Sequence, residues 1–198
     1  MRVKTDDRRN VIIDAAIKVF RDEGYARASM DNIARLSGGS KATLYGYFKS
    51  KEELFEAAMK SAVSSAEERI NKLLDTESED LRGVLIRSAD AYLEFILSDE
   101  ILAITRAIIG EGPKGLGPVL YDQGPRHGID ILARFFSEQI RRGRLREANP
   151  LTAALHFKGL IESDHLEAAL YNAKPSRKRR AAIIDAVDVF LAAYGAPD

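Results

Sequence analysis

The sequence contains no cysteine and no tryptophan, and it has no long uninterrupted apolar run. Without cysteine, the chain can form no disulfide framework and no thiolate nucleophile. No apolar stretch approaches the roughly 20 residues that a membrane-spanning helix needs. The first ten residues, MRVKTDDRRN, lead straight into a charged segment and lack the apolar core of a secretory signal. We therefore expect a cytoplasmic protein with no membrane partner.

The composition is that of a globular protein with an uneven charge distribution. The chain has 198 residues, of which 45% are hydrophobic and 30% are charged. Residues 1–51 carry 11 Lys and Arg against 6 Asp and Glu, whereas residues 52–198 carry 19 against 24. This imbalance indicates that the first part meets a polyanion and the second does not, although a difference of this size also arises by chance.

The rest of the chain is organised around residues 29–51, SMDNIARLSGGSKATLYGYFKSK. A first short helix is predicted over residues 31–37, with Ser29 as its N-cap. Gly38 and Gly39 then break it, because glycine adopts left-handed backbone angles at little cost. A second short helix is predicted over residues 41–48, with Ser40 as its N-cap. Two short helices joined by a tight turn are typical of a helix-turn-helix unit.

The second short helix is the candidate DNA reader. Leu44 and Phe48 can be buried on one face, while the other faces carry hydrogen-bond donors and no acid. In the major groove, Lys41 could donate to guanine O6 and N7, and Ala42 could touch a thymine methyl. The remaining polar residues suit phosphates, which fix position rather than sequence. The predicted DNA-contacting set is Ser29, Ser40, Lys41, Ala42, Thr43, Tyr45, Gly46, Tyr47 and Lys51.

Apolar residues recur at helical spacing elsewhere in the chain, and no segment alternates with period two. An all-α fold of nine or ten helices is therefore predicted. The first helix should end at Gly24 and bury one apolar stripe, formed by Val11, Ile12, Ala15, Ala16, Val19 and Phe20. The expected helices cover residues 5–23, 31–37, 41–48, 51–74, 81–96, 101–108, 129–142, 150–171 and 176–194.

Residues 110–128 hold six of the 14 glycines and three of the six prolines. We expect this segment to be irregular, with a helical turn around residues 119–122. Such a long loop is either a functional element, such as a pocket wall, or a flexible connection, and the sequence leaves both open. Its GPKGLGP run lacks the G-K-[ST] ending of a phosphate loop, so nucleotide binding is not expected.

Residues 8–60 resemble the N-terminal domain of TetR-family transcriptional repressors. The motifs are Phe20-Arg-Asp-Glu-Gly24-Tyr25, Ser29-Met-Asp-Asn-Ile33-Ala34, Ser40-Lys-Ala-Thr-Leu-Tyr-Gly-Tyr-Phe48 and Lys49-Ser-Lys-Glu-Glu-Leu54. The family pattern T-[LI]-Y-x-[HY]-F followed by K-x-x-L is matched by Thr43, Leu44, Tyr45, Tyr47, Phe48, Lys51 and Leu54. Gly39 replaces the valine that is usual in the turn, which should loosen its packing. Gly46 replaces a larger residue, which removes one potential contact.

The resemblance implies a two-domain, all-helical homodimer. Residues 1–50 would form the helix-turn-helix DNA-binding domain, residues 51–75 a connecting helix, and residues 76–198 the ligand-binding and dimerisation domain. The dimer would form through residues 151–171 and 176–194, although the apolar stripe of the last helix could equally be internal core. Binding of a small molecule would change the separation of the two reading domains and release a palindromic operator in double-stranded DNA. No cofactor and no metal are implied.

The effector cannot be identified from the sequence. Five aromatic residues could line its pocket, although each alone is more typical of core: Tyr92, Tyr121, Phe135, Phe136 and Phe157. Our hypothesis is that the protein is a ligand-responsive repressor, and two alternatives remain. One is a DNA-binding regulator controlled by a protein partner. The other is an all-α enzyme with its chemistry in the C-terminal domain.

Several charged residues have ordinary explanations. His127, His156 and His165 lack the spacing of metal ligands, so surface, interface or pocket-lining roles are favoured. Asp164 and His165 lie near Glu162, but no nucleophile is placed beside them, so catalysis is not expected. The basic run at residues 177–180 is interpreted as a solvated face or as a partner for acidic residues of another chain.

Overall fold

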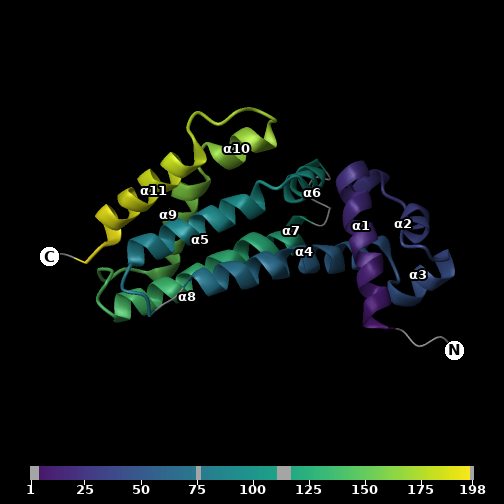
Figure 1. Cartoon of the computed structure of the whole chain (residues 1–198), viewed down its shortest axis with the longest axis horizontal. Helices are drawn as coiled ribbons and strands as arrows, with labels where there is room; N and C mark the ends of the chain where they lie inside the picture. The colour runs from purple at the N-terminus through teal and green to yellow at the C-terminus, as the bar shows by residue number, and fades with distance from the viewer. Residues whose placement is uncertain (1–4, 75–76, 111–116, 197–198) are drawn as a thin grey trace. The chain divides into compact units, whose positions relative to one another are not determined.

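The computed structural model describes residues 5–74, 77–110 and 117–196. Within these ranges the chain is helical and forms no strand element, with one isolated bridge between Leu145 and Gly195. The all-α prediction is thus confirmed. The helices (Figure 1) are α1 Asp6–Arg27, α2 Met30–Leu36, α3 Lys41–Tyr47, α4 Lys51–Leu73, α5 Leu81–Ile96, α6 Asp99–Gly110, α7 Gly117–Tyr121, α8 His127–Arg141, α9 Pro150–Glu162, α10 His165–Leu170 and α11 Arg179–Tyr194.

The helices pack into two compact units. The N-terminal unit comprises Met1–Ser65 and Asp99–Gln123, and the C-terminal unit comprises Ala66–Ser98 and Gly124–Asp198. Helix α4 begins in the first unit and ends in the second. The predicted domain division at residues 50 and 75 differs from this packing, because α6 and α7 group with the N-terminal helices. No helix among the described residues is both long enough and apolar enough to span a membrane.

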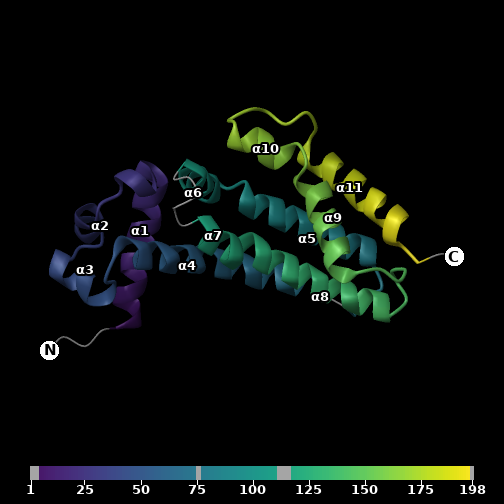
Figure 2. The same cartoon turned by 180° about the vertical axis from the view of Figure 1, so that it is seen from behind.

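Helix α1 forms the centre of the N-terminal unit, with α2 and α3 beside it in both ribbon views (Figures 1 and 2). The predicted stripe is correct except for Val11, which is 46% exposed, whereas Ile13 is buried in its place. Gly24 breaks the helix with a φ of 74°, and one further turn follows it. Side chains from five helices form the shared core: Ile12, Ala16 and Phe20 of α1, Ile33 of α2, Leu44 of α3, Leu54 and Phe55 of α4, and Ile104 of α6.

The core of the C-terminal unit is built around a group of aromatic rings. Phe190 is fully buried and stacks on Phe136 and Tyr194, with centroid distances of 4.8 Å in both cases. Phe157 meets the ring of Phe190 edge-on at 5.0 Å. These residues come from α8, α9 and α11, and α9 packs against both of the other helices (Figure 2). The apolar stripe of α11 is therefore internal core, the second of the two roles that the sequence left open.

The expected single helix over residues 150–171 is wrong, because it is broken at Ser163 and Asp164. Asp164 has a φ of 61°, and its carboxylate accepts hydrogen bonds from the backbone N–H of Ser176 and Arg177 and from the Ser176 hydroxyl. These bonds fold the chain back on itself between α9 and α11. They also use the N–H groups at the expected start of the last helix, and α11 begins at Arg179 rather than at Ser176.

The expectation of an irregular segment over residues 110–128 is also wrong in its second half. The chain is helical from Gly117 to Tyr121, continues through a π-helical turn over Asp122–Arg126, and enters α8 at His127. The helical turn expected at residues 119–122 falls within this run. Residues 111–116 lie outside the described residues.

Candidate nucleic-acid interface

The two short helices of the N-terminal unit are capped as the sequence predicts. Ser29 precedes α2, and its hydroxyl accepts a hydrogen bond from the Asn32 N–H at 3.2 Å. Ser40 precedes α3 in the same way and accepts from the Thr43 N–H at 3.1 Å. Each cap satisfies a backbone donor that the helix itself leaves unpaired. Both serine hydroxyls are therefore already engaged in local structure.

Helix α3 buries one face and exposes the other. Leu44 within the helix and Phe48 at its C-terminal cap are each 1% exposed and belong to the core of the unit. The predicted contact residues lie on the remaining surface: Lys41, Ala42, Tyr45 and Gly46 are exposed, whereas Thr43 and Tyr47 are half-buried. Helix α3 carries no acid on this surface. An exposed short helix with one cation, a methyl group and a phenol can present groups to base edges and phosphates.

Lys41, the predicted base-reading cation, is held by a neighbouring carboxylate. Its Nζ lies 2.8 Å from Asp31 Oδ1 of α2, and both side chains are more than half exposed. The hydrogen bond and the charge of Asp31 raise the pKa of Lys41 above its ordinary value. The base contact predicted for Lys41 would require its ammonium to leave Asp31. This pair could not be foreseen from the sequence, because the two residues are ten positions apart on different helices.

Lys51 contacts the protein backbone. Its Nζ donates to the carbonyl oxygens of Tyr25, Ala26 and Ala28 at 2.9, 3.4 and 3.3 Å. The ammonium also lies 4.3 Å from the centroid of the Tyr25 ring. A cation at this position stabilises the negative end of α1 and the link to α2. The proposed phosphate contact of Lys51 stays a prediction, and it would have to compete with these three bonds.

Tyr47 links α3 to the start of α1, because its hydroxyl accepts the Thr5 N–H at 3.1 Å. Arg9 of α1 lies over the Phe48 ring at 5.1 Å. Arg8, which the sequence analysis did not select, donates through Nη1 to the Ser37 carbonyl at 2.7 Å. The first turn of α1 thus contacts both the turn and α3. Contacts over such sequence separations leave no periodic signal that could have predicted them.

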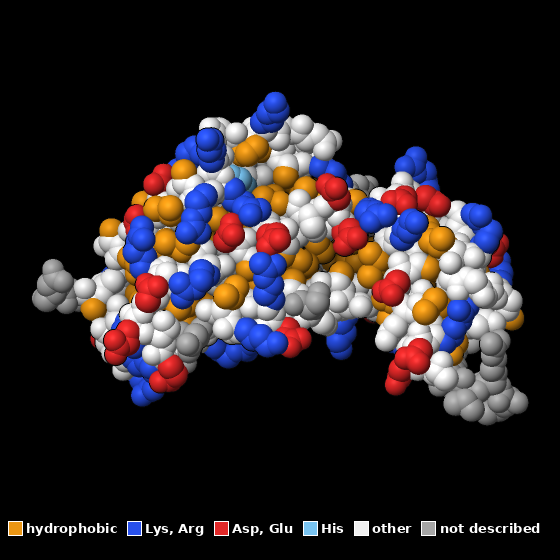
Figure 3. Space-filling model, viewed as in Figure 1, with side chains coloured by type: hydrophobic (Ala, Val, Ile, Leu, Met, Phe, Trp, Pro, Cys, Tyr) orange, Lys and Arg blue, Asp and Glu red, His pale blue; other side chains and the backbone are white. Residues whose placement is uncertain are grey.

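On the face seen in Figure 3, the N-terminal unit carries both basic and acidic side chains rather than one continuous basic strip. Part of this mixing comes from ion pairs within the unit. Arg21 lies 2.9 Å from Asp22 and 3.2 Å from Glu100. On this face, the charge excess of the first 51 residues does not form one basic patch.

The five aromatic residues predicted for a ligand pocket are not brought together as one lining. Phe135, Phe136 and Phe157 are buried in the core of the C-terminal unit. Tyr92 packs against that core, and its hydroxyl donates to Glu162, which also binds Lys158 at 2.6 Å. Burial and the charge of Glu162 raise the pKa of Tyr92 well above its ordinary value. Tyr121 lies in the N-terminal unit and is 48% exposed.

A hollow of about 230 Å³ opens on the C-terminal unit. It is lined by the last turns of α4 and by α8, through Asn71, Leu74, Ile131, Arg134 and Phe135. Phe135 is the one predicted pocket residue that lines it. Typical small-molecule pockets measure about 300–1,000 Å³, so this hollow is small for such a ligand.

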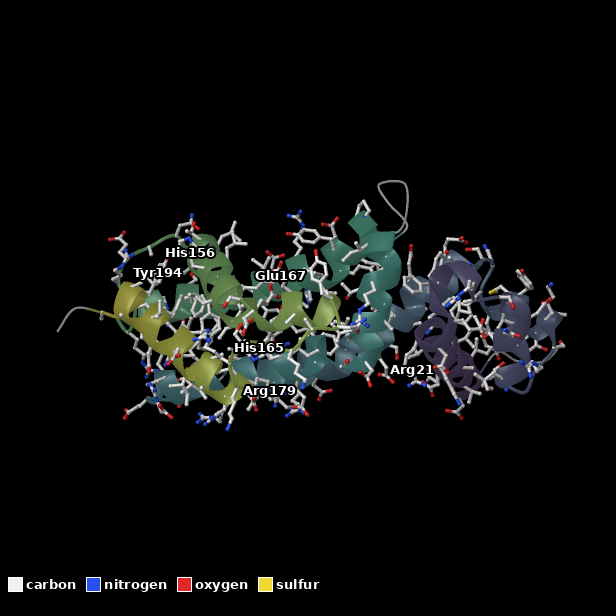
Figure 4. The ribbon with its side chains drawn as sticks, turned by 90° about the horizontal axis from the view of Figure 1, so that it is seen from above. Arg21, His156, His165, Glu167, Arg179 and Tyr194 are labelled. Atoms are coloured by element: carbon white, nitrogen blue, oxygen red, sulfur yellow. The ribbon has the colours of Figure 1, made fainter. Side chains whose placement is uncertain are left out.

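The three histidines have separate surroundings. His156 is hydrogen-bonded to the Tyr194 hydroxyl at 2.5 Å, and Figure 4 shows the two side chains together between α9 and α11. His127 lies 2.9 Å from Glu67, and His165 is 4% exposed. Among the described residues, no group of three or more His, Asp and Glu side chains could hold a metal. In the basic run, Arg177 pairs with Asp185 and Arg179 with Asp90, so acids of the same chain partner these cations.

Comparison with protein families gives two separate matches. Residues 12–58 match the model described as bacterial regulatory proteins of the tetR family. Residues 83–196 match the C-terminal domain of AefR-like transcriptional repressors, and this match alone covers more than half of the chain. Together, the two matches cover the helix-turn-helix unit and most of the remaining helices.

Individual proteins agree with these matches. The nicotine-responsive transcriptional repressor HdnoR of Paenarthrobacter nicotinovorans is 33% identical over 138 residues, which are 70% of this chain and 66% of HdnoR. Other curated regulators are matched over less than half of their length. A crystal structure of a TetR-family regulator from Mesorhizobium loti aligns with a TM-score of 0.87 at 27% identity, covering 98% of this chain and 100% of that one. The flavonoid-responsive regulator FrrA aligns with a TM-score of 0.77 at 28% identity, covering 96% and 98%.

Proposed function

The chain belongs to the TetR family of bacterial transcriptional regulators, and we propose that it is a homodimeric repressor that a small molecule releases from a palindromic operator. The family resemblance predicted from residues 8–60 is confirmed. The matched families consist of transcriptional regulators, and HdnoR is a transcriptional repressor. The alternative of an all-α enzyme is therefore set aside.

The orientation of α3 is the observation that supports DNA binding most directly. Leu44 is buried, whereas Lys41, Ala42, Tyr45 and Gly46 are exposed together. The test is to select duplexes from a random DNA pool with the purified protein, and then to measure binding of the selected duplex over a range of salt concentrations. A palindromic consensus with salt-sensitive affinity is expected. Recovery of no preferred sequence would contradict the proposal.

Within this surface, we propose that Lys41 and Ala42 read bases, while Ser29, Ser40, Thr43, Tyr45 and Tyr47 contact phosphates, with Gly46 allowing close approach of the backbone. Lys41→Ala should relax base preference at one operator position, with a loss of about 1–3 kcal/mol against the preferred base. The measurement is competition between the selected duplex and single-base variants. An equal loss for every variant would make Lys41 a phosphate contact instead.

We also propose that α9 and α11 form the dimer interface, within residues 151–171 and 176–194. Leu151, Leu155 and Val189 lie on these helices and are about half exposed, and Tyr171 just beyond α10 is 78% exposed. Large exposed apolar side chains that lie close together commonly mark an association surface. Leu155→Glu should yield monomers in size-exclusion chromatography with light scattering. Leu36→Glu on α2 is the matched control, because Leu36 is equally exposed at 47%.

The effector is proposed to be a small, largely apolar organic molecule bound in the C-terminal unit. The relatives HdnoR and FrrA respond to nicotine and to a flavonoid, respectively, according to their names. Native mass spectrometry of the purified protein would detect a co-purified compound, and that compound should release the selected duplex. Because the hollow beside Phe135 is small for such a ligand, control by a protein partner is the second candidate. Release by a protein fraction, but by no small compound, would favour it.

A further inference from the structure

The turn between α2 and α3 lacks the side chain that usually closes a turn of its kind. The Gly38 N–H donates to the Arg35 carbonyl at 3.1 Å, and the Gly39 N–H donates to the Ala34 carbonyl at 2.9 Å. This pair of bonds, with Gly38 at a φ of 68°, is the Schellman motif. The residue at the position of Gly39 commonly makes an apolar contact with the end of the preceding helix. Glycine cannot make this contact, and it also leaves the backbone freer to move.

The guanidinium of Arg8 occupies the space that a side chain at Gly39 would fill. A Cβ atom built on Gly39 would lie 2.2 Å from Arg8 Nη2 and 3.5 Å from Arg8 Cζ. Arg8 Nη1 donates to the Ser37 carbonyl at 2.7 Å in a partly buried bond. Ser37 is the C-terminal cap of α2, where carbonyls lack helical partners and the helix dipole favours a cation. One side chain therefore fills the gap and satisfies the helix end.

We propose that Arg8 is a positioning residue for the DNA-reading helix, holding the glycine turn in the conformation that orients α3. The proposal rests on the proposed function of α3. Arg8 suits this role because it lies in the first turn of α1. The Thr5 hydroxyl caps this turn by accepting a hydrogen bond from the Arg8 N–H at 3.3 Å. Without Arg8, the Ser37 hydroxyl, 3.9 Å from the Cβ position of Gly39, would be the nearest side-chain group of the three that lie closest to this position.

A double-mutant cycle tests the coupling between Arg8 and Gly39, with the selected duplex as the probe. Arg8→Ala should weaken binding about tenfold, as expected for loss of a charged hydrogen bond. Gly39→Ala should weaken binding several-fold, because the new methyl displaces the guanidinium. Gly39 does not have a left-handed φ, so alanine is compatible with its backbone. In the Arg8→Ala background, Gly39→Ala should instead strengthen binding a few-fold, because the methyl fills vacated space and restricts the turn.

Arg9→Ala is the matched control. Arg9 neighbours Arg8 and carries the same charge, but it lies over Phe48 instead of the turn. In its background, Gly39→Ala should remain unfavourable. The salt dependence gives a second readout, because a lost phosphate contact lowers the salt slope by about one. Arg8→Ala should leave that slope unchanged. A slope lowered by about one, together with additive effects of Arg8 and Gly39, would make Arg8 a phosphate contact and overturn the proposal.

Amide hydrogen exchange of the free protein separates this proposal from DNA binding itself. The Gly39 N–H, which is bonded to Ala34, should exchange faster in Arg8→Ala and regain protection in the double variant. Circular dichroism establishes that each variant keeps its helices. If no duplex is selected, the proposed function fails while the exchange data still test the role of Arg8. Unchanged Gly39 exchange in Arg8→Ala would overturn it.

Discussion

The carbonyl-bound cations of the N-terminal unit can be compared with the ion pairs of the C-terminal unit, although each unit also contains contacts of the other kind. In the N-terminal unit, Arg8 and Lys51 donate to backbone carbonyls at helix ends. In the C-terminal unit, cations pair with carboxylates between helices, as in Arg82 with Asp188 and Arg179 with Asp90. A cation bound by carbonyls stabilises the fold and keeps its full charge, whereas an ion pair cancels it. The N-terminal unit can thus be braced by cations and still attract a polyanion.

The largest expected effect tests whether apolar packing, rather than ion pairing, stabilises the C-terminal unit. Phe190→Ala should lower the free energy of unfolding by about 3–5 kcal/mol, because it removes a fully buried ring from a group of four aromatic side chains. Urea denaturation followed by circular dichroism measures the change. Ile109→Ala is the control and should change stability by less than about 0.5 kcal/mol, since Ile109 is 66% exposed.

The next effect tests the carbonyl-bound cations. Lys51→Met should lower the free energy of unfolding by about 2 kcal/mol, because three carbonyl oxygens lose a charged donor. It should also weaken binding to all DNA sequences alike. Lys49→Met, on an exposed neighbour, is the control for charge. A salt slope unchanged from wild type would mean that Lys51 acts through the fold. A slope lowered by about one would instead support its predicted phosphate contact.

A smaller effect is expected for the ion pairs of the C-terminal unit. Arg82→Ala should lower the free energy of unfolding only slightly, although its guanidinium binds Asp188 through two bonds of 2.7 and 3.0 Å. Both side chains are about half exposed, and exposed pairs contribute little. A cycle with Asp188→Ala measures the pair itself. A coupling energy as large as the loss caused by Lys51→Met would remove the contrast between carbonyl-bound cations and ion pairs.

The last prediction concerns pH. Hydrogen bonds from Arg141 and Arg142 lower the pKa of Glu138 from 4.5 to about 2. Because the carboxylate is favoured in the folded state, its contribution is present above pH 4.5 and is lost as the pH falls towards 2. Glu138→Gln should flatten this part of the pH dependence of unfolding. An identical acid dependence in wild type and variant would show that these hydrogen bonds contribute nothing to stability.

Most of the helices could be predicted because periodic apolar residues and caps are local signals. Residues 81–96 and the caps Ser29 and Ser40 were predicted correctly for this reason. The break at Asp164 could not be, because its carboxylate bonds to Ser176 and Arg177 across a turn of the chain. The exposure of Val11 likewise depends on which neighbours α1 meets.

The site was predicted in outline. The exposed residues of α3 follow from its buried Leu44 and Phe48, so their positions could be read from spacing alone. The sequence predicts looser packing at Gly39. In the structure, Arg8, which lies 31 residues earlier in the chain, fills this space. The Asp31 partner of Lys41 and the carbonyl partners of Lys51 were missed for the same reason. Side chains that meet across helices depend on tertiary geometry, which periodicity does not encode.

Gly46 gives this regulator room to evolve. A Cβ atom added there would have no neighbour within 4 Å, although the position lies on the exposed face of α3. New side chains can therefore be tried at the DNA surface without repacking the core, and replacing a helical glycine with alanine typically gains about 1 kcal/mol. At position 46, a small library or natural drift can therefore shift operator preference at little cost to the fold.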